Sequence, residues 1–395
     1  MRPGNFKRIA AVLLAAACVC QSGFAAPEKK AAGGKKRVTR LEWEKIRIDD
    51  GTFESAGVFD VNNDGKLDIV CGAYWYEGPD FKKKHHIRDV MPADEYWDDF
   101  STIPMDVNGD GYTDFITGGW WGQTLWWVEN PKGRSSDWPV HEIDKCGSIE
   151  TTRGWDVDGD GQIEICPNTP GEPLRFYKLV DGKWKKIQKE GGSGHGLGFG
   201  EVVPGRKGFI VTNGWWEAPK ENPLDAEWEF HPEFNLGGAS VPVLVEDING
   251  DGKNEIVVGQ AHGYGLDYYT MEIRNASRTW IKHPIDPWFS QYHEMQYVDI
   301  DGDGEKEIVT GNRYRAHCGN EPGETDVVGL YYFKWNGESF TKCVIDHGKK
   351  GEASGTGIFM WIGDLFGSGR MDIVAPGKEG LYVFKNLGPE TVGQK

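Results

Sequence analysis

The chain has 395 residues, enough for two or three ordinary domains or for one large repeat domain. It contains 55 Gly and 17 Trp residues, a usage that suits many tight turns between aromatic-rich strands. The formal net charge of −17 argues against a nucleic-acid-binding protein, because such proteins gain much of their affinity from Lys and Arg on phosphates.

Residues 1–26 have the pattern of an export signal, with a basic start, a short apolar run and then small residues. The apolar run is too short to span a membrane stably. We therefore expect cleavage after Ala25 or Ala26 and a secreted or periplasmic protein without a membrane span. Lipid attachment at Cys18 is the less favoured alternative. Residues 27–40 are predicted to form a basic linker.

The five cysteines outside the export signal have no C-x-x-C spacing and are too sparse for a disulfide scaffold. Cys71 and Cys166 lie in apolar, strand-like runs, so we expect them to be small buried side chains. The sequence leaves open whether Cys318 and Cys343 form a disulfide.

An acidic motif, D-x-[DN]-x-D-G-x-x-[DE], recurs along the chain and leads each time into apolar, aromatic and outer strand-like segments. Clear copies begin at Asp60, Asp106, Asp156, Asp247 and Asp299, and degenerate copies begin at Glu201 and Asp364. Successive copies begin 45 to 65 residues apart, and most spacings fit the period of a four-stranded propeller blade. The sequence thus predicts an all-β protein, a single seven-bladed β-propeller of four-stranded blades over residues 41–390.

The two ends of the predicted propeller complement each other. The last copy stops after LYVFKNLG, its third strand, whereas LEWEKIRID at 41–49 resembles the fourth strands of other copies. We expect this N-terminal strand to complete the last blade and close the ring, which removes an edge that would invite aggregation.

The acidic loops are predicted to bind Ca²⁺. An EF-hand needs a Glu at position 12, but here the acid stands at position 9 and a strand follows. Side chains at positions 1, 3, 5 and 9 can supply oxygens, and the Gly at position 6 permits the bend. Solvated acidic turns without metal are the alternative, and the degenerate copies should be metal-free. The expected ligands of the five structural sites are Asp60, Asn62, Asp64, Asp68, Asp106, Asn108, Asp110, Asp114, Asp156, Asp158, Asp160, Glu164, Asp247, Asn249, Asp251, Glu255, Asp299, Asp301, Asp303 and Glu307.

These loops, with their blade context, resemble the FG-GAP or VCBS repeats of integrin-type and bacterial propellers over about residues 41–388. The resemblance implies a structural role for calcium, on the face opposite the usual ligand site. It does not specify an activity, because propellers host many functions.

On the other predicted face lie the loops from fourth to first strands and from second to third strands. Four histidines, His195, His262, His293 and His317, lie on such loops of copies four to six. Together they could bind a further divalent metal or provide a general base. Six other histidines map to outer strands and are interpreted as structural: His85, His86, His141, His231, His283 and His347.

Arginines and aromatic residues on the same loops complete the predicted pocket. Arginines could hold a carboxylate or an enolate oxygen, tyrosines could donate protons, and tryptophans could form platforms for sugar rings. Packing between blades is the alternative for each tryptophan, including Trp75. The predicted catalytic residues are His195, His262, His293, Arg313, Tyr314 and His317. The predicted substrate-binding residues are Trp97, Trp120, Trp121, Trp215, Trp216, Tyr264, Tyr292 and Arg315.

The segments GHGLGFGE, NGWWEAP, SQYHEMQYVDIDGDG and TGNRYRAHCGNEPGE are similar to the propeller part of the aldos-2-ulose dehydratase family and its bacterial relatives. The resemblance implies elimination of water or of a glycoside from oxidised sugars. It also implies that His195, His293, Arg313 and His317 lie in the lyase pocket.

Two functions follow from these patterns. The first is an exported carbohydrate lyase or dehydratase that acts by β-elimination on oxidised sugars or uronate glycans. The second is a non-catalytic propeller that binds glycans or proteins, which requires aromatic platforms but not the histidines. The sequence leaves the oligomeric state open.

Overall fold

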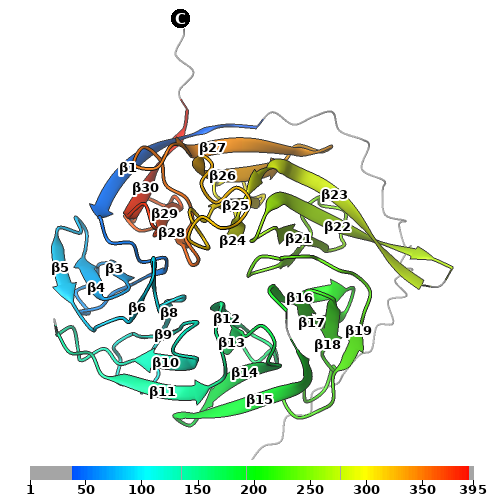
Figure 1. Ribbon diagram of the computed structural model, residues 1–395, viewed down its shortest axis with the longest axis horizontal. Coiled ribbons are helices and arrows are strands. Elements are labelled where there is room, and N and C mark those ends of the chain that lie inside the picture. The colour runs from blue at the N-terminus through cyan, green and yellow to red at the C-terminus, as the bar shows by residue number, and fades with distance from the viewer. Residues whose placement is uncertain (1–37, 135, 193, 276, 391–395) are drawn as a thin grey trace, which may run out of the picture. The chain divides into compact units, whose positions relative to one another are not determined.

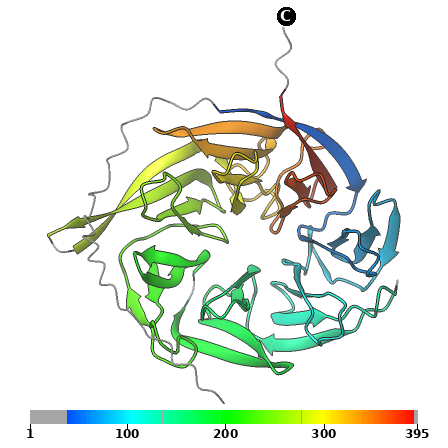
Figure 2. The ribbon, with the colours of Figure 1, turned by 180° about the vertical axis from the view of Figure 1, so that it is seen from behind.

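In the computed structural model, the described residues 38–134, 136–192, 194–275 and 277–390 form seven four-stranded antiparallel sheets arranged as a propeller (Figure 1). The view from behind shows the same ring of blades (Figure 2). The predicted all-β, seven-bladed fold is confirmed. The predicted export signal and most of the predicted linker lie outside the described residues. Within the described ranges no helix is long and apolar enough to cross a membrane.

The first four blades follow chain order, and a short hairpin of β6 (Pro92–Ala93) and β7 (Tyr96–Trp97) lies between blades one and two. Blade one contains β2 (Ala56–Phe59), β3 (Asp68–Cys71), β4 (Tyr74–Glu77) and β5 (Lys83–His86), and blade two contains β8 (Ile103–Met105), β9 (Asp114–Gly118), β10 (Thr124–Val128) and β11 (Val140–Lys145). Blade three contains β12 (Thr151–Trp155), β13 (Glu164–Asn168), β14 (Pro173–Val180) and β15 (Lys183–Gly192), and blade four contains β16 (Leu197–Val203), β17 (Arg206–Val211), β18 (Gly214–Glu217) and β19 (Glu229–His231).

Blades five and six repeat this order, and blade seven takes its fourth strand from the start of the described chain. Blade five contains β20 (Leu244–Glu246), β21 (Glu255–Gly259), β22 (Tyr264–Arg274) and β23 (Ser277–Ser290). Blade six contains β24 (Tyr292–Val298), β25 (Glu307–Asn312), β26 (Val328–Trp335) and β27 (Phe340–Gly348). Blade seven contains β28 (Trp361–Gly363), β29 (Asp372–Ala375), β30 (Leu381–Pro389) and β1 (Leu41–Asp49). Strand β1 pairs antiparallel with β30, with Leu41 opposite Pro389 and Asp49 opposite Leu381. The predicted closure of the ring is confirmed.

Apolar side chains fill the spaces between neighbouring blades. Six of the seven second strands are buried along their whole length, as in β3, β9 and β25, because both faces of each inner strand meet another sheet, whereas β17 is buried only from Gly208 on. Cys71 and Cys166 are buried in these strands as predicted. Cys318 and Cys343 are both free thiols, so they do not form a disulfide in this structure.

The outer-strand histidines have a structural role that repeats between blades. In blade one, His85 stacks on Trp75 with ring centroids 4.2 Å apart, and its Nε2 atom lies 3.2 Å from a Glu77 oxygen. Because the third and fourth strands place these side chains opposite each other, the stack is a cross-strand pair. The same set recurs as Trp127, His141 and Glu129, and as Trp215, His231 and Glu217.

A buried ion pair crosses the centre of the ring. The guanidinium of Arg153 on β12 contacts the Glu294 carboxylate on β24 and lies 2.5 Å from the Val241 carbonyl oxygen. It also lies over the ring of Phe359 at 4.5 Å. Arg153 and its three partners lie in or just before the first strands of blades three, five, six and seven, so the pair ties opposite sides of the ring together. Burial raises the pKa of Glu294 to about 7 in spite of Arg153. Removal of either partner would leave the other one buried without its counter-charge, which destabilises the fold.

Candidate functional site

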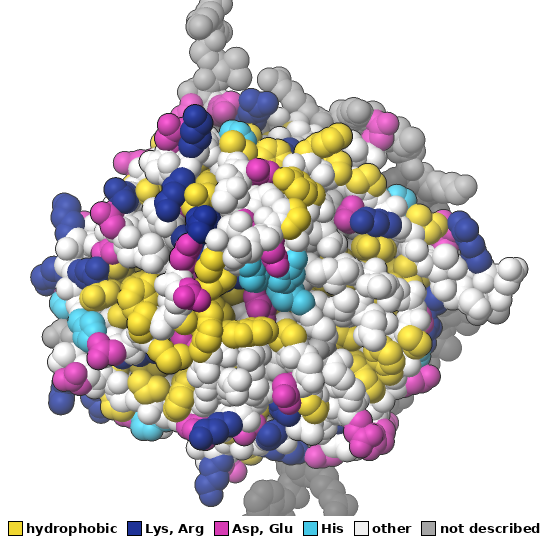
Figure 3. All heavy atoms as spheres, viewed as in Figure 1, with side chains coloured by type: hydrophobic (Ala, Val, Ile, Leu, Met, Phe, Trp, Pro, Cys, Tyr) yellow, Lys and Arg dark blue, Asp and Glu magenta, His cyan; other side chains and the backbone are white. Residues whose placement is uncertain are grey.

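The four predicted histidines come together near the centre of one face of the ring. The ring centroids of His195 and His262 are 4.2 Å apart, and those of His262 and His317 are 4.6 Å apart. His293 lies 5.1 Å from His195 by the same measure. Figure 3 shows histidine side chains beside acidic ones around a central hollow. Since the strands of each blade are antiparallel, these loops lie at the strand ends away from the acidic loops.

A buried inner layer of the site is built around Glu150, which precedes β12 and is 5 % exposed. One of its oxygens lies 2.9 Å from Nε2 of His293 and 3.4 Å from Nε2 of His195. Burial alone would raise the pKa of Glu150, but the two histidines hold that pKa well below its usual range. Glu150 is therefore a carboxylate at neutral pH.

Arg313, which follows β25, supports this layer from the side. Its guanidinium is buried and makes a two-pronged ion pair with Glu54, with N–O distances of 2.8 and 3.1 Å. Its Nη1 atom also lies 3.3 Å from Nε2 of His293. Burial and the Arg313 charge lower the pKa of His293 well below its usual value, so the imidazole is neutral.

The inner layer carries one unbalanced negative charge. Arg313 neutralises one of the two carboxylates, Glu54 and Glu150, and His293 contributes none at neutral pH. A buried surplus charge is costly unless a cation balances it. A proton on a neighbouring imidazole or a bound metal ion would supply that balance.

The residues of the inner layer fit a divalent transition metal. Nδ1 of His195 lies 2.7 Å from the Ala239 carbonyl oxygen, which places its proton there and leaves a lone pair on Nε2. That Nε2 atom is buried and has no hydrogen-bond partner among the described residues. One ligand atom from each of Glu150, His195 and His293 lies within 4.8 Å of the other two. Two imidazoles and a carboxylate suit Zn²⁺ or a similar ion.

A partly exposed outer layer lies above the inner one. Nδ1 of His262 lies 3.0 Å, and Nδ1 of His317 lies 2.9 Å, from the Glu321 carboxylate. Both imidazoles are about 30 % exposed, at 29 % and 30 %. Burial and the neighbours His195 and His317 lower the pKa of His262, and burial and Arg313 lower that of His317. Both are therefore neutral near pH 7 and able to accept a proton.

The structure corrects the predicted roles of two catalytic candidates. His293 is 0 % exposed and Arg313 is 1 % exposed, so neither can touch a substrate in this conformation. His293 lies on β24, the innermost strand of blade six, and Arg313 directly follows β25. Both therefore lie beneath the exposed histidines. Tyr314 lies instead in a groove outside the histidine cluster.

Two predicted platform residues are also buried. Trp215 and Tyr292 are both 0 % exposed, because Trp215 stacks on His231 and the Tyr292 hydroxyl donates to Asp286 at 2.9 Å. These two cannot bind a sugar. Trp120, Trp121 and Tyr264 are exposed, whereas Trp97 and Trp216 are half-buried. The Arg315 guanidinium pairs with Glu95 at 2.7 Å.

The carboxylates of the site were missed by sequence reasoning. Glu54 gives no local signal, because its partner Arg313 lies 259 residues away. Glu150, Glu321 and Glu324 stand on the same class of loop as the histidines, and Glu324 lies 3.4 Å from Nδ1 of His317. Applying the loop argument to acids as well as to histidines would have found these three.

The acidic loops share one geometry on the opposite strand ends. In the first loop, Asp60 accepts the Gly65 amide at 2.7 Å, and buried Asp68 accepts the Val61 amide at 2.9 Å. Burial and the neighbouring acids raise the pKa of Asp68 to about 6. Packing these oxygens together therefore costs free energy that a cation would offset.

In two of the five clear loops, one lysine ammonium contacts three of the acids. Lys334 of β26 lies 2.6 Å from Asp301 and 2.8 Å from both Asp303 and Glu307. Lys178 of β14 makes the corresponding contacts with Asp158, Asp160 and Glu164 at 2.5, 2.7 and 3.0 Å. These are the two loops with an Asp at position 3, where the other three have Asn. The extra carboxylate is thus matched by a charge from the chain itself.

Comparison with known proteins supports the fold. No family model matches the chain, and no curated protein matches it. Among solved structures, BBS1N in complex with ARL6DN is similar at 12 % identity and a TM-score of 0.52, over 90 % of this chain and 100 % of that one. The rhamnogalacturonan lyase YesW matches at 13 % identity and 0.44, over 91 % and 76 %. An Agrocybe aegerita lectin that recognises non-reducing terminal N-acetylglucosamine matches at 15 % identity and 0.34, over 89 % and 81 %. At these identities the likeness concerns the propeller fold alone.

Proposed function

We propose that the protein is an exported, calcium-stabilised propeller lyase that cleaves a C–O bond in carbohydrate by β-elimination. The observation that carries this proposal is the layered histidine site. Two neutral, partly exposed imidazoles stand over a buried set of two further imidazoles and a carboxylate. A purely structural cluster does not require neutral, partly exposed imidazoles above buried residues whose charges do not balance.

His317 or His262 would act as the base. Nδ1 of His262 is hydrogen-bonded to Glu321, and donation of its proton there would leave the Nε2 lone pair free to take a proton. Nδ1 of His317 lies 2.9 Å from the same carboxylate. The base would remove the proton α to a carbonyl or uronate carboxylate. The C–H electrons then form the C=C bond, and the C–O bond to the leaving oxygen breaks as that oxygen takes a proton from solvent water. The Glu321 carboxylate stabilises the imidazolium that forms.

The inner layer would stabilise the developing enolate through a bound cation. Glu150, His195 and His293 would hold a divalent metal, which acts as a Lewis acid when bound. Arg313 is not available for this task, because Glu54 already pairs with its guanidinium. Arg313 and Glu54 would instead hold His293 in place and keep it neutral.

A non-catalytic glycan-binding propeller is the second candidate. The exposed side chains of Trp120 and Trp121, at 36 % and 38 %, favour it because flat aromatic faces can stack on sugar rings. This candidate makes no use of neutral imidazoles.

Incubation with uronate oligosaccharides and with keto-sugars separates the two candidates. A lyase produces a conjugated double bond, seen as a rise in ultraviolet absorbance, together with a shorter saccharide or a dehydrated sugar. Binding without any such rise for the whole panel would refute the lyase and favour the binding module.

A further inference from the structure

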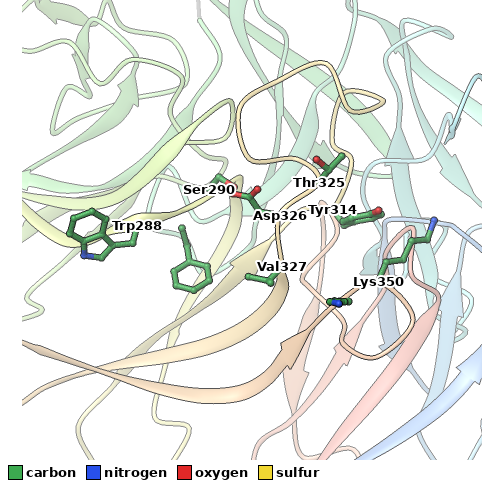
Figure 4. A pocket seen from close by; sticks show the side chains of 9 residues that line it. Trp288, Ser290, Tyr314, Thr325, Asp326, Val327 and Lys350 are labelled. Atoms are coloured by element: carbon green, nitrogen blue, oxygen red, sulfur yellow. The ribbon is translucent and has the colours of Figure 1, made fainter.

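A groove of about 760 Å³ lies on the histidine face, beside the cluster. Its walls come from the end of β23, from the loop between β25 and β26, and from the loop after β27. Figure 4 shows Trp288 at one end and Tyr314 with Lys350 at the other. A hollow of this size falls in the usual range for small-molecule sites.

The groove is continuous with the histidine site through one loop. Tyr314, Thr325 and Asp326 line the groove, while His317 and Glu321 of the same loop face the histidines. The hydroxyl of Tyr264, the first residue of β22 after the loop that carries His262, donates to Asp326 at 2.7 Å. An extended ligand in the groove would therefore lie beside the exposed imidazoles.

Two lysines, against the single acid Asp326, give the lining of the groove an excess of positive charge. Lys349 and Lys350 are exposed, and neither ammonium forms an ion pair with the described residues. Lys350 also borders a second hollow of about 340 Å³, whose other charged residues are Lys378, Asp94, and Arg315 with its partner Glu95. The chain has a net charge of −17, which repels anions from most of its surface. The two unpaired lysine ammonium groups therefore make the groove a favourable place for an anion.

Aromatic faces accompany the charges. Trp288 is 81 % exposed at the outer end of the groove, and Tyr314 lies 5.3 Å from the Lys350 ammonium at the inner end. Aromatic faces stack on sugar rings and ammonium groups pair with carboxylates or sulfates. A neutral sugar would leave the lysines unused.

We propose that this groove is a subsite for an acidic oligosaccharide, which enters past Trp288, pairs its anionic groups with Lys349 and Lys350, and extends toward His317. The assignment rests on the proposed function for its carbohydrate class. It deepens that function, because it selects an acidic chain over a neutral oxidised monosaccharide as the substrate.

Calorimetric titration of the full-length protein tests this proposal. The probes are tetrasaccharides of galacturonate, of mannuronate and of sulfated galactose, each beside its methyl-esterified or desulfated neutral counterpart. At least one acidic probe should bind at least about tenfold more tightly than its neutral partner. The carboxylate and sulfate arms identify which anion is recognised.

The double variant Lys349→Gln/Lys350→Gln should weaken the acidic probe about tenfold or more and leave its neutral partner unchanged. Trp288→Ala should weaken both members of the pair. The matched control Lys183→Gln/Lys220→Gln removes two exposed lysines outside the groove and should change nothing. Equal binding of acidic and neutral probes, or an acidic preference that survives the loss of both groove lysines, would overturn the proposal.

The double variant His262→Gln/His317→Gln separates this inference from the proposed function. It should bind the acidic probe as the wild type does and produce no unsaturated product. Elimination that depends on these histidines without an acidic preference would overturn the groove alone. An acidic preference without elimination by the wild type would overturn the lyase and leave the groove in place.

Discussion

Nε2 of His293 lies 2.9 Å from a carboxylate oxygen of Glu150, although 143 residues separate the two in the chain. His293 belongs to blade six and Glu150 precedes the first strand of blade three. Both are buried, so their contact crosses the middle of the ring. The candidate site therefore depends on closure of the whole propeller.

The first prediction concerns a metal in the inner layer. Metal-free full-length protein titrated with Zn²⁺ should bind it, and Glu150→Gln or His195→Ala should lower the affinity by at least about tenfold, because each removes a ligand. Glu129→Gln, which changes a carboxylate beside the outer-strand His141, is the control. Unchanged Zn²⁺ affinity in both ligand variants would show that the metal, if bound, lies elsewhere.

The second prediction concerns calcium. Chelation should lower the unfolding temperature, because ions that bind only the folded protein stabilise it. Asp247→Asn, in a clear loop outside the two whose acids a lysine ammonium bridges, should reduce the effect of calcium more than Asp364→Asn, in a degenerate copy. A melting curve that excess chelator leaves unchanged contradicts the calcium assignment.

The third prediction concerns the lysine in the loop at Asp299. The Lys334 side chain is 5 % exposed and contacts three carboxylates. Lys334→Met should cost about 3 to 5 kcal/mol of unfolding free energy in chelator, because it leaves buried acids unpaired. Added calcium should recover part of that loss, since the ion can take the vacated position. Exposed Lys66→Met is the control. If Lys334→Met were as stable as the control in chelator, the ammonium would not balance the loop.

The fourth prediction concerns closure of the ring. Deletion of β1 (Leu41–Asp49) should expose the edge of β30 and the apolar residues beneath it, so the protein should aggregate or lose its cooperative unfolding. Deletion of residues 27–37 should have little effect. Light scattering and thermal melts compare the two, and similar behaviour of both truncations would be incompatible with closure by β1.

The fifth prediction concerns pH and Glu379, in the loop between β29 and β30. Burial raises the pKa of this carboxyl to about 7 in the folded protein. Because the folded pKa lies above the unfolded one, its contribution to stability is present below about pH 4.5 and is lost as the pH rises through about 7. Glu379→Gln should therefore match the wild type near pH 5 and be more stable by up to about 3 kcal/mol near pH 8.

Urea unfolding at the two pH values measures this difference. Exposed Glu142→Gln is the control and should have the same small effect at both. A Glu379→Gln effect that does not grow with pH would show that the buried carboxyl does not ionise in this range.

The blade architecture could be predicted because each blade has the same local sequence pattern, which repeats along the chain. Each acidic loop of the seven copies marks one turn between the first two strands of a blade, and the strand at Leu41–Asp49 matches the fourth strands. The gathering of the histidines could be predicted for the same reason, since antiparallel order assigns each loop to a face.

Contacts across the ring could not be predicted in this way. Arg313 and Glu54, and likewise Arg153 and Glu294, meet only when distant blades close around the axis. The burial of Trp215 and Tyr292 could not be predicted either, because an aromatic residue near a strand end can face either solvent or the neighbouring blade. The lysines of the acidic loops lie on third strands, and their reach into the loop is a property of the folded sheet.

The central claim is that the exposed histidines perform an elimination. The most direct test is the initial rate of ultraviolet absorbance increase, on the substrate that the wild type turns over, for His317→Gln, His262→Gln and exposed His86→Gln. We predict that His317→Gln, His262→Gln or both lose at least about a hundredfold in rate, as expected for loss of a general base. Both should unfold within about 1 kcal/mol of the wild type, because the side chains are partly exposed. His86→Gln should keep full activity. Wild-type rates in both site variants would contradict the account.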